Sequence, residues 1–280
     1  MKKKKFIEYI LVLKKKSFTQ LRDQIKRLAI KIYYFLILKR KVSNQLNDNL
    51  KLRYNKSSKK KIFIPLIETS HYQIFHMLIL AKSLVLRGHE VKILICNGFL
   101  KGCEIKNFRN KDIKNPCWEC KYNIEKILPL LGLDYVFYKD YLDSDDRKKI
   151  FNLEKKFSKN LKSKVKYKNY YLTQTVNDSL VRYYYGIEFF DNHKNIRSEH
   201  INTSLTSVIF AEKLYKKWNP DVILTNMIVY SAWEPFFMYF RNKKKRIATI
   251  NLNVLNKHSI YFNLIDLLLS NDRYKNYLKK

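Results

Sequence analysis

The sequence of 280 residues contains few glycines and prolines, five of each. Loops that cradle phosphate groups depend on glycine, and neither G-x-G-x-x-G nor G-x-x-x-x-G-K-[ST] occurs anywhere in the chain. The sequence therefore excludes the two common nucleotide-binding loops. With 46% apolar and 29% charged residues, the composition is that of a globular protein rather than a disordered one.

Long hydrophobic runs are also missing. No segment approaches the roughly 20 apolar residues that span a bilayer. The start of the chain, MKKKKFIEYILVLKKKSF, imitates a secretory signal. However, Glu8 interrupts its apolar part, and three lysines follow where a small-residue cleavage site would be needed. We therefore expect a cytoplasmic protein whose cysteines are reduced.

Acidic residues are scarce. The chain holds 24 of them against 57 lysines and arginines, which gives a net charge of +33. Residues 1–61 alone carry 20 lysines and arginines and three acidic residues, a net charge of +17. Such an excess predicts attraction to lipid headgroups, nucleic acid or phosphorylated substrates.

Residues 5–42 are predicted to form one or two basic amphipathic helices, followed by a linker over 43–60. The apolar stripe of this segment consists of Leu21, Ile25, Leu28, Ile32, Phe35 and Leu36. A helix of this kind can lie in the membrane interface, or it can pack on the domain and leave a solvated basic face. The neighbouring aromatic residues favour the first interpretation, a peripheral location on the inner face of the cell membrane.

The stretch from residue 60 to residue 97 organises the rest of the chain. A short apolar run over 62–67 predicts a buried parallel strand. A helix with one apolar stripe follows and is expected to end at Gly88, and a second strand is predicted over 91–96. Strand, helix and strand in this order indicate a right-handed βαβ unit.

Three further strands are predicted over 133–138, 221–225 and 246–252, with helical segments between them. One of these segments, over 143–164, is strongly charged and is expected to be a solvent-exposed helix. The fold class is thus α/β, with a doubly wound, Rossmann-like parallel sheet whose strand order the sequence leaves open. We divide the chain into a basic extension and linker (1–58), the Rossmann-like domain (59–258) and a C-terminal helix or linker (259–280).

The segment LILAKSLVLRGHEVKILIC resembles the first βαβ unit of GT-B glycosyltransferases, in which an Ala/Leu-rich helix precedes Arg-Gly-His-Glu-Val and a strand. Here the motif is Arg87, Gly88, His89, Glu90 and Val91. The segments that follow, through Leu131-Gly132-Leu133, are similar to GT-B-like proteins of bacterial capsule and surface-polysaccharide biosynthesis. The resemblance covers roughly residues 60–255 and implies the N-terminal domain of that fold.

In the GT-B family the nucleotide-sugar donor lies mostly on a second domain, which this sequence does not show. The resemblance therefore implies an acceptor-binding half that needs a donor-binding partner in trans, or a truncated remnant. The acceptor would be lipid-linked or a free saccharide.

The loop after the first strand is the first candidate site, because ligands of parallel sheets bind at the carboxyl ends of the strands. In many inverting GT-B enzymes a histidine in this loop removes the proton of the acceptor hydroxyl. The resemblance assigns that role to His71, with Glu68 as the supporting carboxylate or as the base itself. Ser70 and Tyr72 are candidates for substrate contact. The alternative is that His71 merely caps a helix.

The loop after the fourth strand is expected to face the same site. Asn226, Tyr230, Trp233 and Glu234 are candidates for contact with the acceptor, because tyrosine and tryptophan rings suit the C–H faces of sugars. Core packing explains Trp233 equally well.

All four cysteines, Cys96, Cys103, Cys117 and Cys120, lie within 25 residues. The C-x-x-C spacing at the end of this group is that of a metal-binding knuckle, so four thiolates are a candidate structural Zn²⁺ site, and an Fe–S cluster is a second possibility. The alternative is a buried strand cysteine at Cys96, with the other three incidental.

Three functions are thus compatible with the sequence. The first is the glycosyltransferase-like acceptor-binding half on an anionic membrane surface. The second is a nucleic-acid-binding protein, suggested by the net charge, although the basic residues concentrate in the extension and no recognition motif occurs. The third is a membrane-associated scaffold without chemistry.

Overall fold

The computed structural model describes residues 59–67, 71–103, 117, 124, 128, 131–160, 163–184 and 194–250. The predicted basic extension (1–58), most of residues 104–130 and the predicted C-terminal helix or linker (259–280) lie outside these residues. None of the described helices combines the length and the apolar character of a membrane-spanning segment.

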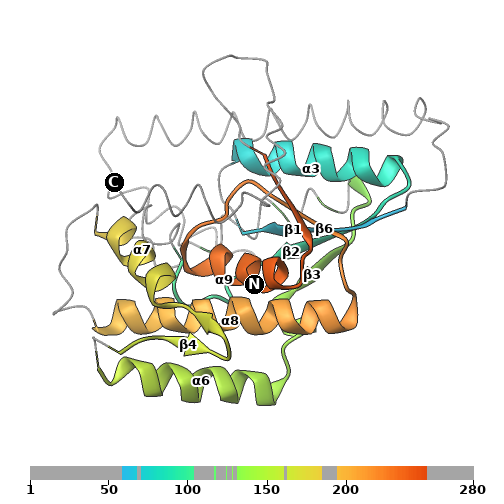
Figure 1. Cartoon of the computed structure of the whole chain (residues 1–280). Helices are drawn as coiled ribbons and strands as arrows, with labels where there is room; N and C mark the ends of the chain where they lie inside the picture. The colour runs from blue at the N-terminus through green and yellow to red at the C-terminus, as the bar shows by residue number, and fades with distance from the viewer. Residues whose placement is uncertain are drawn as a thin grey trace, which may run out of the picture. The chain divides into compact units, whose positions relative to one another are not determined.

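The described part is an α/β fold built on a five-stranded parallel sheet, which confirms the predicted Rossmann-like class (Figure 1). The strand order is β3-β2-β1-β6-β7. The strands are β1 (Lys61–Leu66), β2 (Glu90–Ile95), β3 (Tyr135–Phe137), β6 (Val222–Thr225) and β7 (Arg246–Thr249). The helices are α3 (His71–Leu86), α6 (Ser144–Ser158), α7 (Thr173–Tyr183), α8 (Lys194–Lys217) and α9 (Tyr230–Asn242), with a 3-10 turn η2 (Tyr138–Asp140).

Strand β1 lies at the centre of the sheet. It pairs with β2 from Lys61↔Glu90 to Leu66↔Ile95, and with β6 at Ile62↔Val222. Helices cover both faces of the sheet, so β1 reads in the sequence as an almost unbroken apolar run instead of an alternating one.

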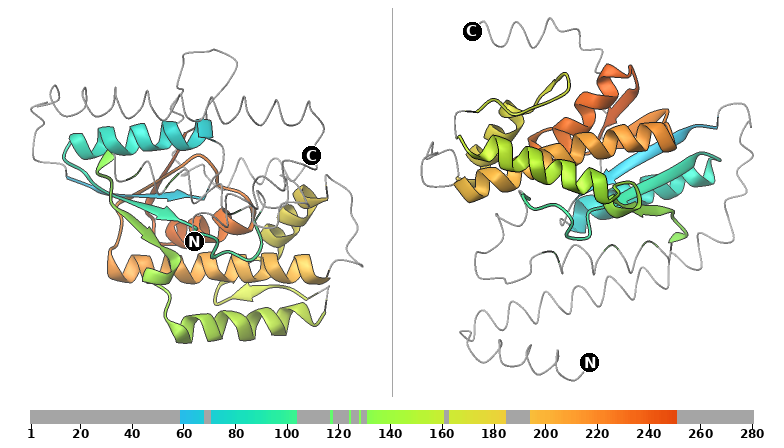
Figure 2. Two further views of the ribbon diagram at one scale, coloured as in Figure 1. Left: turned by 180° about the vertical axis from the view of Figure 1, so that it is seen from behind. Right: turned by 90° about the horizontal axis from the view of Figure 1, so that it is seen from below.

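The elements form layers (Figures 1 and 2). Helix α3 covers one face of the sheet, α8 and α9 cover the other, and α6 packs on the side of α8 away from the sheet. Phe63 of β1 links the sheet to the second layer, since its ring centroid lies 5.6 Å from that of Phe236 and 6.1 Å from that of Phe210.

Helix α3 ends as the sequence predicts. Gly88 has a φ of +82°, which a residue without a Cβ adopts at little cost. Its N–H donates to the Val85 carbonyl at 2.9 Å, and the N–H of His89 donates to the Leu84 carbonyl at 3.1 Å. The Nδ1 of His89 then accepts a hydrogen bond from the backbone N–H of Lys60 at 3.3 Å. The turn is thereby tied to the start of β1.

Two features differ from the expectation for residues 143–164. Helix α6 ends at Ser158, and one of its faces is buried through Asp146, Ile150 and Glu154. A short antiparallel hairpin, β4 (Lys166–Tyr167) and β5 (Tyr170–Tyr171), follows it. Strands of two residues are too short to show a period in the sequence.

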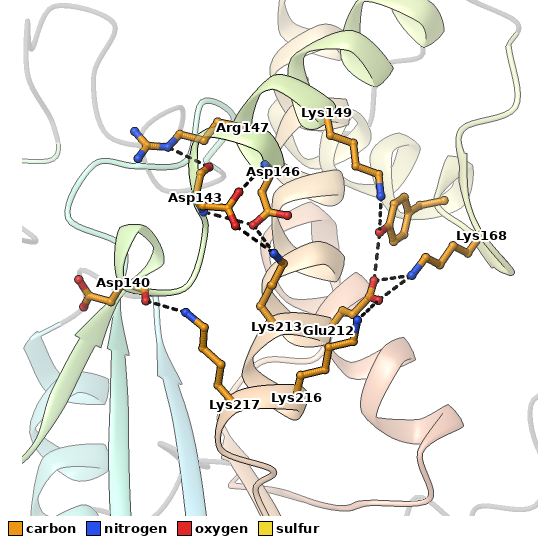
Figure 3. A network of polar contacts seen from close by, with 11 residues as sticks. Asp140, Asp143, Asp146, Arg147, Lys149, Lys168, Glu212, Lys213, Lys216 and Lys217 are labelled. Atoms are coloured by element: carbon orange, nitrogen blue, oxygen red, sulfur yellow. Dashed lines mark hydrogen bonds and ion pairs between the residues drawn. The ribbon is translucent and has the colours of Figure 1, made fainter.

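A network of charged side chains joins α6, the hairpin and α8 (Figure 3). Lys213 lies 2.8 Å from Asp146, and Lys168 lies 2.6 Å from Glu212, which also accepts a hydrogen bond of 3.0 Å from Tyr167. Burial opposes the charge on Glu212, but the hydrogen bonds outweigh it and lower the pKa of this carboxyl to about 2. The carboxylate is therefore ionised and paired at neutral pH.

Candidate functional site

The strand order defines where a ligand would bind. From β1 the chain moves outward through β2 to β3, and then crosses to the other side of β1 to add β6 and β7. The switch point lies between β1 and β6. Doubly wound sheets bind their ligands outside the carboxyl ends of the strands at this point.

Only some of the candidate residues predicted after β1 are among the described residues. Helix α3 begins at His71, five residues after the end of β1, so the backbone of His71 and Tyr72 forms the first turn of the helix beside the switch point. Glu68 and Ser70 lie outside the described residues. The catalytic role assigned to His71 and Glu68 stays a prediction.

The first turn of α9 holds the residues predicted after β6, and its backbone is strained. Tyr230 has a φ of +74°, a conformation that costs a bulky residue about 1–3 kcal/mol and that is often found at functional sites. Arg182 of α7 holds this residue in place, because its Nη1 donates to the Tyr230 hydroxyl oxygen at 3.0 Å and its guanidinium lies 4.7 Å from the ring centroid.

Glu234 follows Tyr230 by four residues and so lies on the same face of α9. Its Oε2 accepts a hydrogen bond of 2.9 Å from the hydroxyl of Thr175. Burial raises the pKa of the Glu234 carboxyl, and the charge of Asp178 adds to the rise, whereas the Thr175 hydrogen bond and the charge of Arg241 oppose it. Raised pKa values of buried carboxyls are frequent at functional sites, although structural clusters also produce them.

Three fully buried polar side chains support the same turn of α9. The backbone N–H of Ser231 donates to Oγ of Ser179 at 2.8 Å, and Oγ of Ser231 lies 2.7 Å from Nδ1 of His200 on α8. Helices α7, α8 and α9 thus meet at the start of α9 through hydrogen bonds. The position of the turn is therefore determined by the tertiary structure as well as by the helix itself.

Sequence reasoning missed the α7 side of this site. Thr175, Ser179 and Arg182 recur at steps of four and three residues, which places them on one face of the helix. In a sequence, such a polar stripe is typical of a solvated face. No signal in the sequence shows that this face turns toward α9.

Asn226 and Trp233 each bury a donor that no side chain or backbone group in the described residues accepts: Nδ2 of Asn226 and Nε1 of Trp233. Asn226 comes directly after β6, at the switch point. Trp233 is only 2% exposed and belongs to the hydrophobic core, where its ring packs rather than lying open for stacking. Asn226, Tyr230 and Glu234 lie after the carboxyl end of β6 or in the first turns of α9, and their contact with an acceptor stays a prediction.

The described cysteines do not gather into a metal site. Cys96, Cys103 and Cys117 form no disulfide, and no three potential metal ligands converge in the described residues. Cys117 packs on the turn after β2, since a Cβ added at Gly98 would lie 3.7 Å from its Sγ. Burial raises the pKa of the Cys96 thiol, which disfavours the thiolate that a metal needs. Cys120 lies outside the described residues, and the zinc site stays a prediction.

Comparison with known proteins adds no functional information. No family model matches the chain, and no curated protein does. Among solved structures, a CDPS from Fluoribacter dumoffii aligns with 10% sequence identity and a TM-score of 0.40, covering 66% of this chain and 84% of that one. At this TM-score the similarity supports no conclusion about activity.

Proposed function

We propose that this chain is a glycosyltransferase-like, acceptor-binding unit that acts in capsule or surface-polysaccharide biosynthesis at the cytoplasmic face of the membrane. The observation that supports the proposal most is the strand order. The switch point lies between β1 and β6, and the acceptor residues predicted from the sequence follow these two strands. The resemblance of residues 60–255 to GT-B proteins supplies the sugar chemistry.

In the proposed reaction a base removes the proton of an acceptor hydroxyl. The acceptor oxygen then forms a bond to the anomeric carbon of the donor sugar, and the nucleoside diphosphate leaves with the electron pair of the broken bond. His71 and Glu68 are the bases that the resemblance implies. Glu234 is a third, because burial raises its pKa and so makes its carboxylate a stronger base.

Asn226 and Arg182 would orient the acceptor. The Nδ2 of Asn226 is a buried donor without an acceptor in the described residues, and a sugar hydroxyl can supply one. The guanidinium of Arg182 already holds Tyr230, so it would act by keeping the first turn of α9 in position. The nucleotide-sugar donor is expected to bind through a partner domain or subunit, because the chain has no glycine-rich phosphate loop.

A glycan array probed with the full chain tests acceptor binding. We expect retention on a defined class of saccharide. Asn226→Ala should weaken it about tenfold, as expected for the loss of one buried hydrogen bond. Ser204→Ala is the matched control, because Ser204 is fully buried on α8 and its hydroxyl also has no partner in the described residues. Binding of no saccharide, or equal binding by both variants, would refute the proposal.

A second measurement separates binding from catalysis. The chain alone, incubated with its saccharide and a nucleotide-sugar, is expected to transfer nothing. Transfer by the chain alone would show that it is not a half-enzyme, while acceptor binding would stand.

A further inference from the structure

The described domain has a strongly basic surface on the edge of the sheet opposite the candidate site. Strands β1, β2, β6 and β7 run parallel, so they all begin at the amino edge. We call the segments around these starts, residues 59–61, 87–90, 218–222 and 241–246, the basic rim. It contains nine lysines and arginines and two acidic residues, a net charge of +7 within 18 residues.

Hydrogen bonds show that the segments of the rim adjoin one another. The backbone N–H of Glu90 donates to the Lys60 carbonyl at 2.9 Å, and that of Asp221 donates to the Lys61 carbonyl at 2.8 Å. Val222 pairs with Arg246 in the sheet. The cations of four separate segments therefore share one edge.

Both carboxylates of the rim are occupied within the domain. Glu90 accepts a hydrogen bond of 2.7 Å from Nε1 of Trp218, and Asp221 accepts one of 2.8 Å from the backbone N–H of Lys61. Most of the cations are exposed: Lys59, Lys60, Arg87, Arg241, Lys243, Lys244 and Arg246. The rim thus keeps its excess of positive charge at the surface.

The opposite edge differs in charge. In the described segments that follow the five strands and precede the next helices, Lys101 and Lys139 are balanced by Asp140 and Asp143. Of these, Lys101 already lies 2.8 Å from Glu154. Among the described residues, the general excess of lysine in the chain does not explain why one edge of the sheet is basic and the other is neutral.

We propose that the basic rim docks on the surface of an anionic lipid bilayer. The rim begins at Lys59, and the predicted linker over 43–60 joins it in the sequence to the basic segment with the amphipathic pattern of residues 5–42. Clusters of lysine and arginine next to such a segment bind anionic headgroups, and the attraction extends over about one Debye length. The rim would give the folded domain its own contact with the membrane, in addition to the contact predicted for the extension.

Single-stranded nucleic acid is the other anionic partner, and the rim fits it less well. Proteins that bind it stack bases on open aromatic rings. Beside the rim, the ring centroid of Tyr215 lies 5.4 Å from Nζ of Lys243 and 5.5 Å from Nζ of Lys245, so cations already lie against this ring. Binding to an anionic bilayer surface requires positive charge and no open aromatic ring.

The test uses the full chain and vesicles made of phosphatidylcholine and phosphatidylglycerol in equal amounts. The rim variant is K59E/K60E/K244E, three exposed lysines whose side chains make no contact that holds the fold in the described residues. The matched control is K148E/K155E/K159E, three exposed lysines of α6 and its C-cap, which changes the net charge by the same amount.

In co-sedimentation we expect the rim variant to partition about a hundredfold more weakly, because each lysine near an anionic surface contributes about fivefold. The control should partition onto the vesicles about as strongly as the parent chain. None of the three proteins should bind vesicles of pure phosphatidylcholine. Circular dichroism verifies that both variants fold. Equal losses in both triple variants, or no loss in the rim variant, would overturn the proposal. So would a rim variant that loses binding to a single-stranded RNA oligonucleotide while keeping its affinity for vesicles.

Discussion

Thr175 on α7 donates a hydrogen bond of 2.9 Å to Glu234 on α9, across 59 residues of sequence. On the same face of α7, Ser179 accepts from the backbone of Ser231, and Arg182 donates to Tyr230. One helix face therefore holds the turn of α9 that carries the strained tyrosine and the carboxyl with a raised pKa.

Glu234→Gln should stabilise the protein at high pH. Because burial raises the pKa of the folded carboxyl above its ordinary value, the folded state holds the proton longer than the unfolded state, and stability falls as pH rises through that range. Glutamine keeps an acceptor for Thr175 and removes the buried charge. In urea unfolding at about pH 5 and about pH 8, the free energy of unfolding of the variant relative to that of the parent should be larger at the higher pH. A variant that is less stable at the higher pH would contradict the assignment.

Tyr230→Phe should cost about 1.5–3 kcal/mol of unfolding free energy, because it removes the acceptor of a hydrogen bond from the Arg182 guanidinium. Tyr215→Phe is the control, since cations lie against that ring and no hydrogen bond to its hydroxyl is seen in the described residues. Denaturant titrations of the two variants compare them directly. Equal costs would show that the Tyr230 hydroxyl does not anchor α9.

Glu212→Gln should destabilise the protein at neutral pH by up to about 3 kcal/mol. The pKa of this carboxyl is lowered to about 2 in the folded state, so its contribution is present at neutral pH and is lost as pH falls from the ordinary carboxyl range toward that value. The difference between variant and parent should therefore disappear in acid. Asp134→Asn, at an exposed carboxyl before β3, should change stability little at either pH. A deficit that persists in acid would point to packing instead of charge.

Gly102→Ala should cost about 1–3 kcal/mol through overpacking. A Cβ at this position would lie 2.8 Å from the backbone of Glu199 and of His200 on α8, and backbone atoms cannot move aside as a side chain can. Gly88→Asn is the comparison, because nothing lies within 4 Å of a Cβ there and asparagine tolerates the positive φ. Thermal unfolding should show a clear drop for the first variant and a small one for the second.

The positions of the central strands in the sequence could be predicted because β1 and β2 are buried on both faces. Their apolar runs, together with Gly88 at the end of α3, show where each element begins and ends. The hairpin between α6 and α7 could not be predicted, because its strands have two residues each and its turn depends on Lys168 at a φ of +51°.

Some residues of the candidate site could likewise be proposed from the sequence, and others could not. Asn226, Tyr230 and Glu234 could be proposed from the sequence because the carboxyl end of a predicted strand is where ligands of such sheets bind, and their role stays a prediction. Trp233 was ambiguous, since a tryptophan on a helix serves a core as well as a sugar, and its burial supports the core role. Thr175, Ser179, Arg182 and His200 could not be found, because their polar character is as typical of a solvated helix face.

By itself, the sequence determined the fold class, the ends of the central elements and the excess of positive charge. These depend on residues close together in the chain: apolar runs, helix caps and the count of lysines. Only the tertiary structure decided the strand order, the meeting of α7 with α9, and the gathering of cations from four segments on one edge of the sheet. These relations join residues tens of positions apart, and no local pattern records which face of one element will bury itself against another.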